Sequence, residues 1–146
     1  MRPHIALALI AAAALSQYCG EKGEQKNAAS PKGVGPVKEV QIGATVDAAM
    51  ASEGAKIFQT KCSACHETGA RKVGPAMYEV TKRRAPEWIM NMILNPEEMT
   101  KVDPQAQELL ATYLAQMTFQ NVTQDDARKI LEFFRDTDSK PLKTAK

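Results

Sequence analysis

The pentapeptide Cys62-Ser63-Ala64-Cys65-His66 decides how the rest of this 146-residue chain is interpreted. The pattern C-x-x-C-H is typical of the covalent attachment of a c-type haem. Two thiols add to the two vinyl groups of the haem, and the adjacent imidazole reaches the iron as its proximal ligand. We therefore expect one haem c, attached through Cys62 and Cys65 and ligated by His66.

The chain has too few ligands for a competing zinc site. A structural zinc ion needs four ligands, and the sequence has three cysteines and two histidines, of which Cys19 and His4 lie in or beside a targeting segment. A thioredoxin-like C-x-x-C would need a surrounding β-α-β pattern, whereas the flanks here predict helix and loop. A structural disulfide between Cys62 and Cys65 remains the alternative to haem attachment.

The N-terminus has the pattern of an export signal. Arg2 precedes an apolar run from Ile5 to Leu15 that is too short to span a bilayer comfortably. We expect residues 1–18 to be a signal peptide. The mature protein is then expected outside the cytoplasm, in the periplasm or at the cell surface.

Cys19 follows the apolar run in a context that resembles the lipobox of bacterial lipoproteins. The match is incomplete, because Gln17 and Tyr18 are larger than the residues which that pattern prefers. We expect lipidation of Cys19 and attachment to a membrane surface without a span. An ordinary cleaved signal and an uncleaved anchor are the alternatives.

The segment after Cys19 predicts a tether. Residues 19–45 are rich in Gly, Lys, Glu, Ala and Pro and show no sustained apolar period. Such a composition buries too little to offset the entropy of ordering. We expect a flexible tether over 19–45, a folded domain over 46–138 and a C-terminal tail over 139–146.

The folded region predicts an all-α domain of about four helices wrapped around the haem. Capping residues, first-turn prolines and apolar stripes mark the helices, which we place at residues 48–60, 86–94, 104–116 and 124–136. No segment predicts a strand. A region of this size with few aromatic residues is near the limit of independent stability, so we expect folding to be coupled to haem binding.

The second axial ligand must be a side chain other than histidine, because His66 is the only histidine outside the signal segment. Six methionines are candidates: Met50, Met77, Met90, Met92, Met99 and Met117. A ligand on the opposite haem face should come from a late loop, which favours Met117. Met99 and Met77 remain alternatives.

From about Ala48 to Asp136 the chain resembles class I monohaem cytochromes c. The residues that carry the resemblance are Gly54, Phe58, the C-S-A-C-H motif, Gly74-Pro75, Trp88, Asp103-Pro104, Met117 and the aromatic residues of the last helix.

The resemblance implies roles for several of these residues. The Pro75 carbonyl is expected to bind the second ring nitrogen of His66, and Arg84 and Trp88 to lie near the haem propionates. Phe133 takes the position expected to cross Gly54 and Phe58. One departure is Thr118, which stands where the family commonly has proline after the ligand methionine.

The predicted function is electron transfer by a monomeric, non-enzymatic carrier. We expect redox protein partners, a donor complex and a terminal oxidase or reductase, and a membrane surface. The near-balanced charge gives no indication of nucleic acid. Basic residues around the motif either steer an acidic partner or are simply solvated; they are Lys56, Lys61, Arg71, Lys72, Lys82, Arg83 and Arg84.

Two other functions remain open. One is a haem protein with an open or labile sixth position, such as a peroxidase or a sensor of nitric oxide or carbon monoxide. The other is a haem-bearing subunit of a larger redox enzyme.

Overall fold

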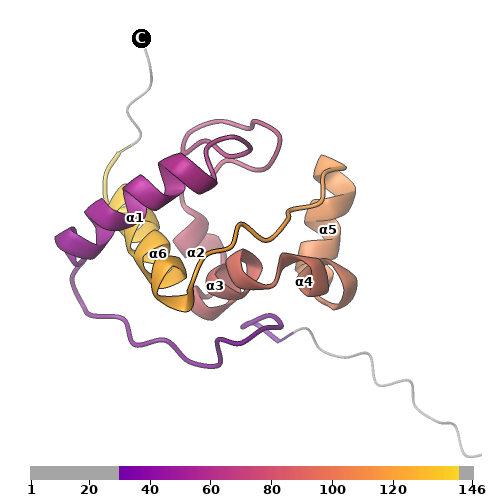
Figure 1. The fold of residues 1–146 in the computed structure, drawn as a ribbon, viewed down its shortest axis with the longest axis horizontal. Helices are drawn as coiled ribbons and strands as arrows, with labels where there is room; N and C mark the ends of the chain where they lie inside the picture. The colour runs from indigo at the N-terminus through magenta and orange to yellow at the C-terminus, as the bar shows by residue number, and fades with distance from the viewer. Residues whose placement is uncertain (1–29, 142–146) are drawn as a thin grey trace, which may run out of the picture.

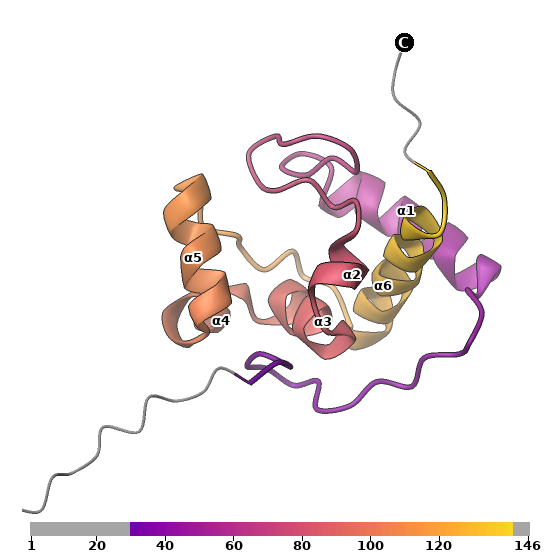
Figure 2. The same ribbon diagram turned by 180° about the vertical axis from the view of Figure 1, so that it is seen from behind.

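The computed structural model describes residues 30–141, and over that range the chain is all-helical, as predicted. Figure 1 and Figure 2 show α1 and α6 crossing on one side of the molecule, α4 and α5 on the other, and α2 and α3 between them. The helices within this range are α1 (Ala48–Lys61), α2 (Val80–Arg83), α3 (Pro86–Leu94), α4 (Pro96–Val102), α5 (Pro104–Tyr113) and α6 (Gln124–Asp138).

The predicted capping residues begin their helices. The Asp47 carboxylate accepts hydrogen bonds from the amides of Ala49 and Met50 at 2.9 and 3.0 Å, and so begins α1. Thr123 and Asp126 form a reciprocal capping box at the start of α6. These bonds satisfy amides that have no partner within the helix.

Two short helices, α2 and α4, were missing from the prediction, and α5 is shorter than predicted. Pro96 ends α3 as expected, but it is also the first residue of α4, where its missing N–H costs nothing. The prediction that the third helix reaches Gln116 was wrong. It ends at Tyr113 because Leu114 is left-handed, with φ 52°.

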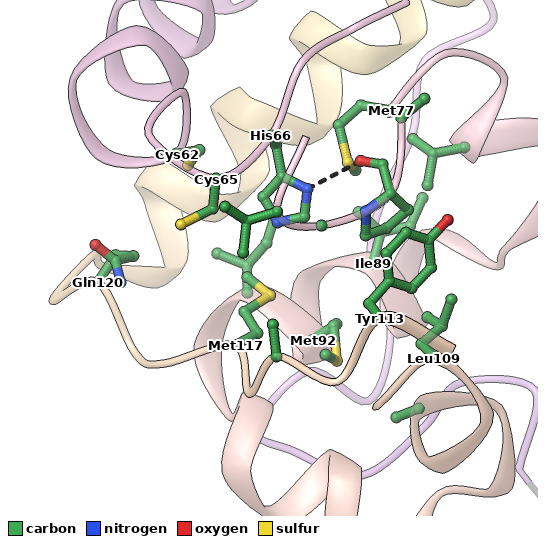
Figure 3. A pocket seen from close by; sticks show the side chains of 18 of the residues that line it. Cys62, Cys65, His66, Met77, Ile89, Met92, Leu109, Tyr113, Met117 and Gln120 are labelled. Carbon is green, nitrogen blue, oxygen red and sulfur yellow. Dashed lines mark hydrogen bonds between the residues drawn. The ribbon is translucent and has the colours of Figure 1, made fainter. Parts of the chain in front are cut away.

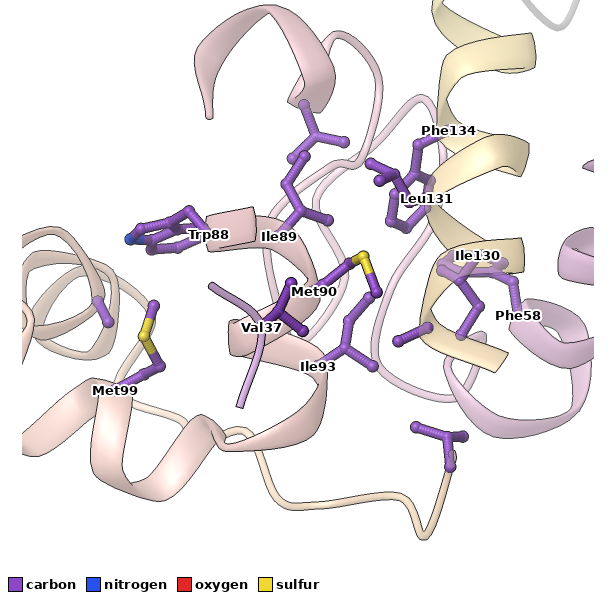
Figure 4. Close-up of a cluster of buried hydrophobic side chains, with 14 residues drawn as sticks. Val37, Phe58, Trp88, Ile89, Met90, Ile93, Met99, Ile130, Leu131 and Phe134 are labelled. Atoms are coloured by element: carbon purple, nitrogen blue, oxygen red, sulfur yellow. The ribbon is translucent and has the colours of Figure 1, made fainter. Parts of the chain in front are cut away.

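The crossing of α1 and α6 is possible because residue 54 is glycine. A Cβ atom at Gly54 would clash with the backbone carbonyl of Lys129 and approach the amide of Ile130 to 2.9 Å. Beside this crossing, Phe58 packs against Phe133, with ring centroids 5.3 Å apart. The two helices therefore meet backbone to backbone, and aromatic rings fill the space alongside, including Phe134, whose ring centroid is 5.7 Å from that of Phe58 (Figure 4).

Residues 30–46, which we call the strap, differ from the predicted tether. Val37 is 2% exposed and belongs to the core, and Figure 4 shows it beside α3. The buried Asn91 side chain accepts from the Val37 amide and donates to the carbonyls of Val37 and Lys32, each at 2.9 Å. One buried amide on α3 thus satisfies the strap backbone, which composition alone did not reveal. Residues 19–29 lie outside the described range.

A buried carboxylate fixes the start of α1 to α6. Glu132 is 0% exposed and accepts from the Asp47 amide at 2.8 Å and from Arg135 at 2.6 Å, with Arg128 on its other oxygen. Arg135 also donates to the Gly43 carbonyl at 2.7 Å. Burial opposes ionisation of Glu132, but these hydrogen bonds outweigh it and lower the pKa.

No helix within residues 30–141 is both long and apolar enough to cross a bilayer.

Glu132→Gln is expected to lower the free energy of unfolding of the holoprotein at pH 7 by about 2 kcal/mol, because two arginines lose their charged acceptor. A lowered pKa means that the Glu132 contribution is present above about pH 4.3 and is lost as pH falls further. Guanidinium unfolding from pH 7 to pH 3 should therefore show the gap between parent and variant closing. The exposed Glu98→Gln is the matched control, and parallel curves for Glu132→Gln would contradict this account.

Candidate haem site

A cavity of about 470 Å³ lies between the Cys62–His66 segment, α3, α5 and the loop that carries Met117. This volume is within the range of about 300–1,000 Å³ that is usual for cofactor pockets. The wall is mainly apolar, with Phe58, Ile89 and Leu109 among its residues. Figure 3 shows the labelled side chains around it.

The two cysteines reach the cavity from a tight turn at the end of α1. The Cys62 amide donates to the Phe58 carbonyl at 2.9 Å, and the amides of Cys65 and His66 both donate to the Cys62 carbonyl, at 3.1 and 3.0 Å. Both sulfurs are free thiols. Burial, with a smaller effect of Cys65, raises the pKa of the Cys62 thiol to about 11, so Cys62 is neutral at pH 7.

The His66 ring is held by the two residues Gly74 and Pro75. Nδ1 of His66 lies 3.1 Å from the Pro75 carbonyl oxygen, which is drawn as the dashed line in Figure 3. Because a carbonyl only accepts, Nδ1 carries the proton and Nε2 keeps its lone pair for a metal. A Cβ at Gly74 would come within 2.5 Å of His66 Cε1, so only glycine lets the ring lie against this backbone.

Three of the six candidate methionines line the cavity: Met77, Met92 and Met117. Met99 does not, because it lies in α4 rather than in a loop and is fully buried, with its sulfur 3.0 Å from the Val34 amide of the strap. In Figure 3 Met117 points toward the His66 ring from its loop, and Met77 lies on the side where His66 meets the Pro75 carbonyl.

Arg84 and Trp88 both line the cavity. The Arg84 guanidinium lies over the Trp88 ring, 5.1 Å from its centroid. The indole N–H donates to Asp103 at 3.1 Å, and Asp103 also caps α5 through the Ala106 amide. Sequence reasoning assigned only the cap to Asp103, because nothing in the local pattern shows a partner fifteen residues away.

The charged residues of the lining are all cationic: Lys61, Arg83 and Arg84. An apolar cavity with two thiols, one imidazole and a cationic edge matches a largely apolar macrocycle that carries two carboxylates. Within residues 30–141, by contrast, no group of three His, Cys, Asp or Glu side chains could hold a bare metal ion. The residues present therefore fit a haem.

Comparisons with known proteins agree with this geometry. Residues 51–138 match the family model described as Cytochrome c. Because this match covers more than half of the chain, the chain belongs to the cytochrome c family. A search of curated protein sequences gave no significant match.

Solved structures extend the comparison to the fold. A cytochrome c from Rhodothermus marinus is 43% identical with a TM-score of 0.71, covering 72% of this chain and 90% of that one. An engineered form of the Rhodothermus marinus protein is 39% identical with a TM-score of 0.73, and the match covers 76% of this chain and 100% of that one. The cytochrome c domain of a Pseudomonas putida protein is 25% identical with a TM-score of 0.55, and the match covers 59% of this chain and 88% of that one.

Gly74→Ala is expected to displace the His66 ring, because the added methyl group would occupy the space of Cε1. The holoprotein should then show less covalently attached haem per chain and a shift toward a high-spin absorption spectrum. Gly43→Ala is the matched control, since a Cβ there meets only Thr45 O at an ordinary 3.5 Å. A normal haem content and low-spin spectrum in Gly74→Ala would show that the ring has room to move.

Proposed function

We propose that this chain is an extracytoplasmic monohaem electron carrier with His66 and Met117 as axial ligands. The observation that carries the proposal is the single cavity that brings together Cys62, Cys65, His66 and Met117. When bound, the haem supplies an iron that cycles between Fe(III) and Fe(II). Membership of the cytochrome c family supports this role, and the electron donor and acceptor are redox proteins.

The protein's own residues would set the properties of this iron. Pro75 orients His66 and makes its free nitrogen more basic. The sulfur of Met117 favours the reduced state and so raises the reduction potential relative to a second nitrogen ligand. The apolar wall excludes water. Lys61, Arg83 and Arg84 are placed to neutralise the carboxylates of the group.

Covalent attachment through Cys62 and Cys65 would hold the group in the cavity during repeated electron transfer. The two sulfurs lie on one turn at the end of α1, next to the ligand His66 (Figure 3). The same short segment would thus fix the position of the haem and supply its proximal ligand. The described lining holds no carboxylate and no histidine besides His66, which favours a carrier over an enzyme.

One observation keeps a second candidate function in consideration, a haem with a labile sixth position. An engineered form of the Rhodothermus marinus cytochrome c, 39% identical to this chain, has been solved with a carbene intermediate bound. That protein holds a small group, and the Met117 loop of this chain has few hydrogen bonds. Rapid carbon monoxide binding by the reduced parent protein would favour this candidate.

Met117→Ala is expected to abolish the weak red-end absorption band of iron–methionine bonding in the oxidised holoprotein, because the sulfur ligand is removed. Met77→Leu and Met92→Leu are the matched controls, since each keeps an apolar side chain of similar volume in the same cavity. Both controls should keep the band. Loss of the band in Met77→Leu, with retention in Met117→Ala, would assign the ligand to Met77 instead.

We also propose that Cys19 carries a lipid that holds the carrier on a membrane, on the periplasmic or cell-surface side. Cys19→Ser is expected to move the exported protein from the membrane fraction to the soluble fraction, measured by haem absorbance after ultracentrifugation. Ala28→Ser, in the predicted tether and outside the lipobox-like stretch, is the matched control. Equal partition of Cys19→Ser and parent would remove the lipid anchor from the proposal.

A further inference from the structure

The loop that carries Met117 has few connections to the rest of the molecule. Within the described residues, Ala115 to Val122 make no backbone–backbone hydrogen bond. The loop follows the left-handed Leu114, which is 87% exposed, and Phe119 is 47% exposed. Among the loop residues Val122, at 5% exposed, is the buried apolar anchor. Met117 is partly buried and packs against the core, so side-chain contacts rather than backbone hydrogen bonds hold the ligand segment.

Gln116 supplies the hydrogen bond that links this loop to another element. Its Oε1 accepts from the Thr100 hydroxyl at 3.0 Å, and its Nε2 donates to the Met117 carbonyl at 2.8 Å. The other side-chain bonds of the loop, from Gln120 to Thr118, stay within it. Gln116 therefore connects α4 directly to the backbone of the candidate ligand.

Thr100 is a fixed point for this connection. It is 8% exposed, and its neighbour Met99 is fully buried against the strap. The Thr100 hydroxyl has one proton, however, and also lies 3.1 Å from the Pro96 carbonyl and 3.0 Å from the Glu97 carbonyl. The bond to Gln116 competes with these two acceptors of the same helix, which makes it easy to exchange.

We propose that Thr100 and Gln116 are positioning residues that hold Met117 at the sixth coordination position, and that their hydrogen bond sets how readily an added ligand displaces the methionine sulfur. The inference rests on the proposed function, because it takes Met117 as the axial ligand. A hydrogen bond of ordinary net strength corresponds to a change of roughly 2- to 12-fold in the displacement equilibrium.

The test is a spectroscopic titration of the oxidised holoprotein with imidazole. Thr100→Val keeps the shape of the side chain and removes the hydroxyl, and it should raise the imidazole affinity roughly 2- to 12-fold. Thr100→Ser restores the hydroxyl and should behave as the parent. Thr112→Val, which removes an exposed hydroxyl that bonds only to the Glu108 carbonyl within α5 and does not line the cavity, is the matched control and should also behave as the parent.

A double variant separates ligand positioning from general loosening of the fold. In a Met117→Ala background the Thr100→Val change should leave the imidazole affinity unaltered, because no sulfur remains to be displaced. If the affinity still rises about as much in that background, the effect does not pass through Met117 and the inference is overturned.

The two ways of failing can be told apart. If Met117→Ala raises imidazole affinity strongly but Thr100→Val does not, the ligand is Met117 and only the positioning role is wrong. If Met117→Ala keeps the red-end band and the parent affinity, the assignment of the ligand under the proposed function is wrong, and the positioning role falls with it.

Discussion

The backbone contact between α1 and α6 at Gly54 is the constraint on which the rest of the structure depends. Because the two helices meet without an intervening side chain, the end of α1 is brought close to the aromatic residues of α6. The haem motif begins where α1 ends. The helix crossing therefore decides where the two thiols and His66 stand relative to the apolar wall.

Ion pairs and hydrogen bonds hold the remaining segments to the helices. The buried Glu132 accepts from the Asp47 amide at the start of α1, and its partner Arg135 donates to the Gly43 carbonyl of the strap. On the other side of the molecule Asn91 holds the strap against α3. These polar contacts join the strap to two helices, and no buried side-chain N or O atom in the described part lacks a hydrogen-bond partner.

The sequence predicted most of what depends on local chemistry. Helix starts follow from capping residues and from first-turn prolines, so Asp47, Pro86, Asp103 and Thr123 mark their positions correctly. The haem motif and the Gly-Pro pair also have short-range signatures, and one cavity is lined by Cys62, Cys65, His66, Gly74 and Pro75. The all-α class follows from the same signals.

Features that depend on distant partners could not be predicted in the same way. The strap has the composition of a linker, and its order depends on distant partners, among them the Asn91 amide of α3, which lies 54 residues from Val37. The early end of α5 depends on the left-handed Leu114, which no local signal marks. Among the methionines, sequence position named Met117, but only the fold separates Met77, Met92 and Met117 from the buried Met99.

The ordered strap has a geometric consequence for a carrier attached at Cys19. Eleven Cα–Cα steps lead from Cys19 to Ser30, the first residue of the strap, whereas 27 lead to Val46, its last residue. At the maximum extension of about 3.6 Å per residue, the reach falls from roughly 97 Å to roughly 40 Å. The space open to such a domain shrinks roughly fifteenfold at this limit. Its encounters would then be confined to partners whose docking sites stand within one protein diameter or so of the same bilayer.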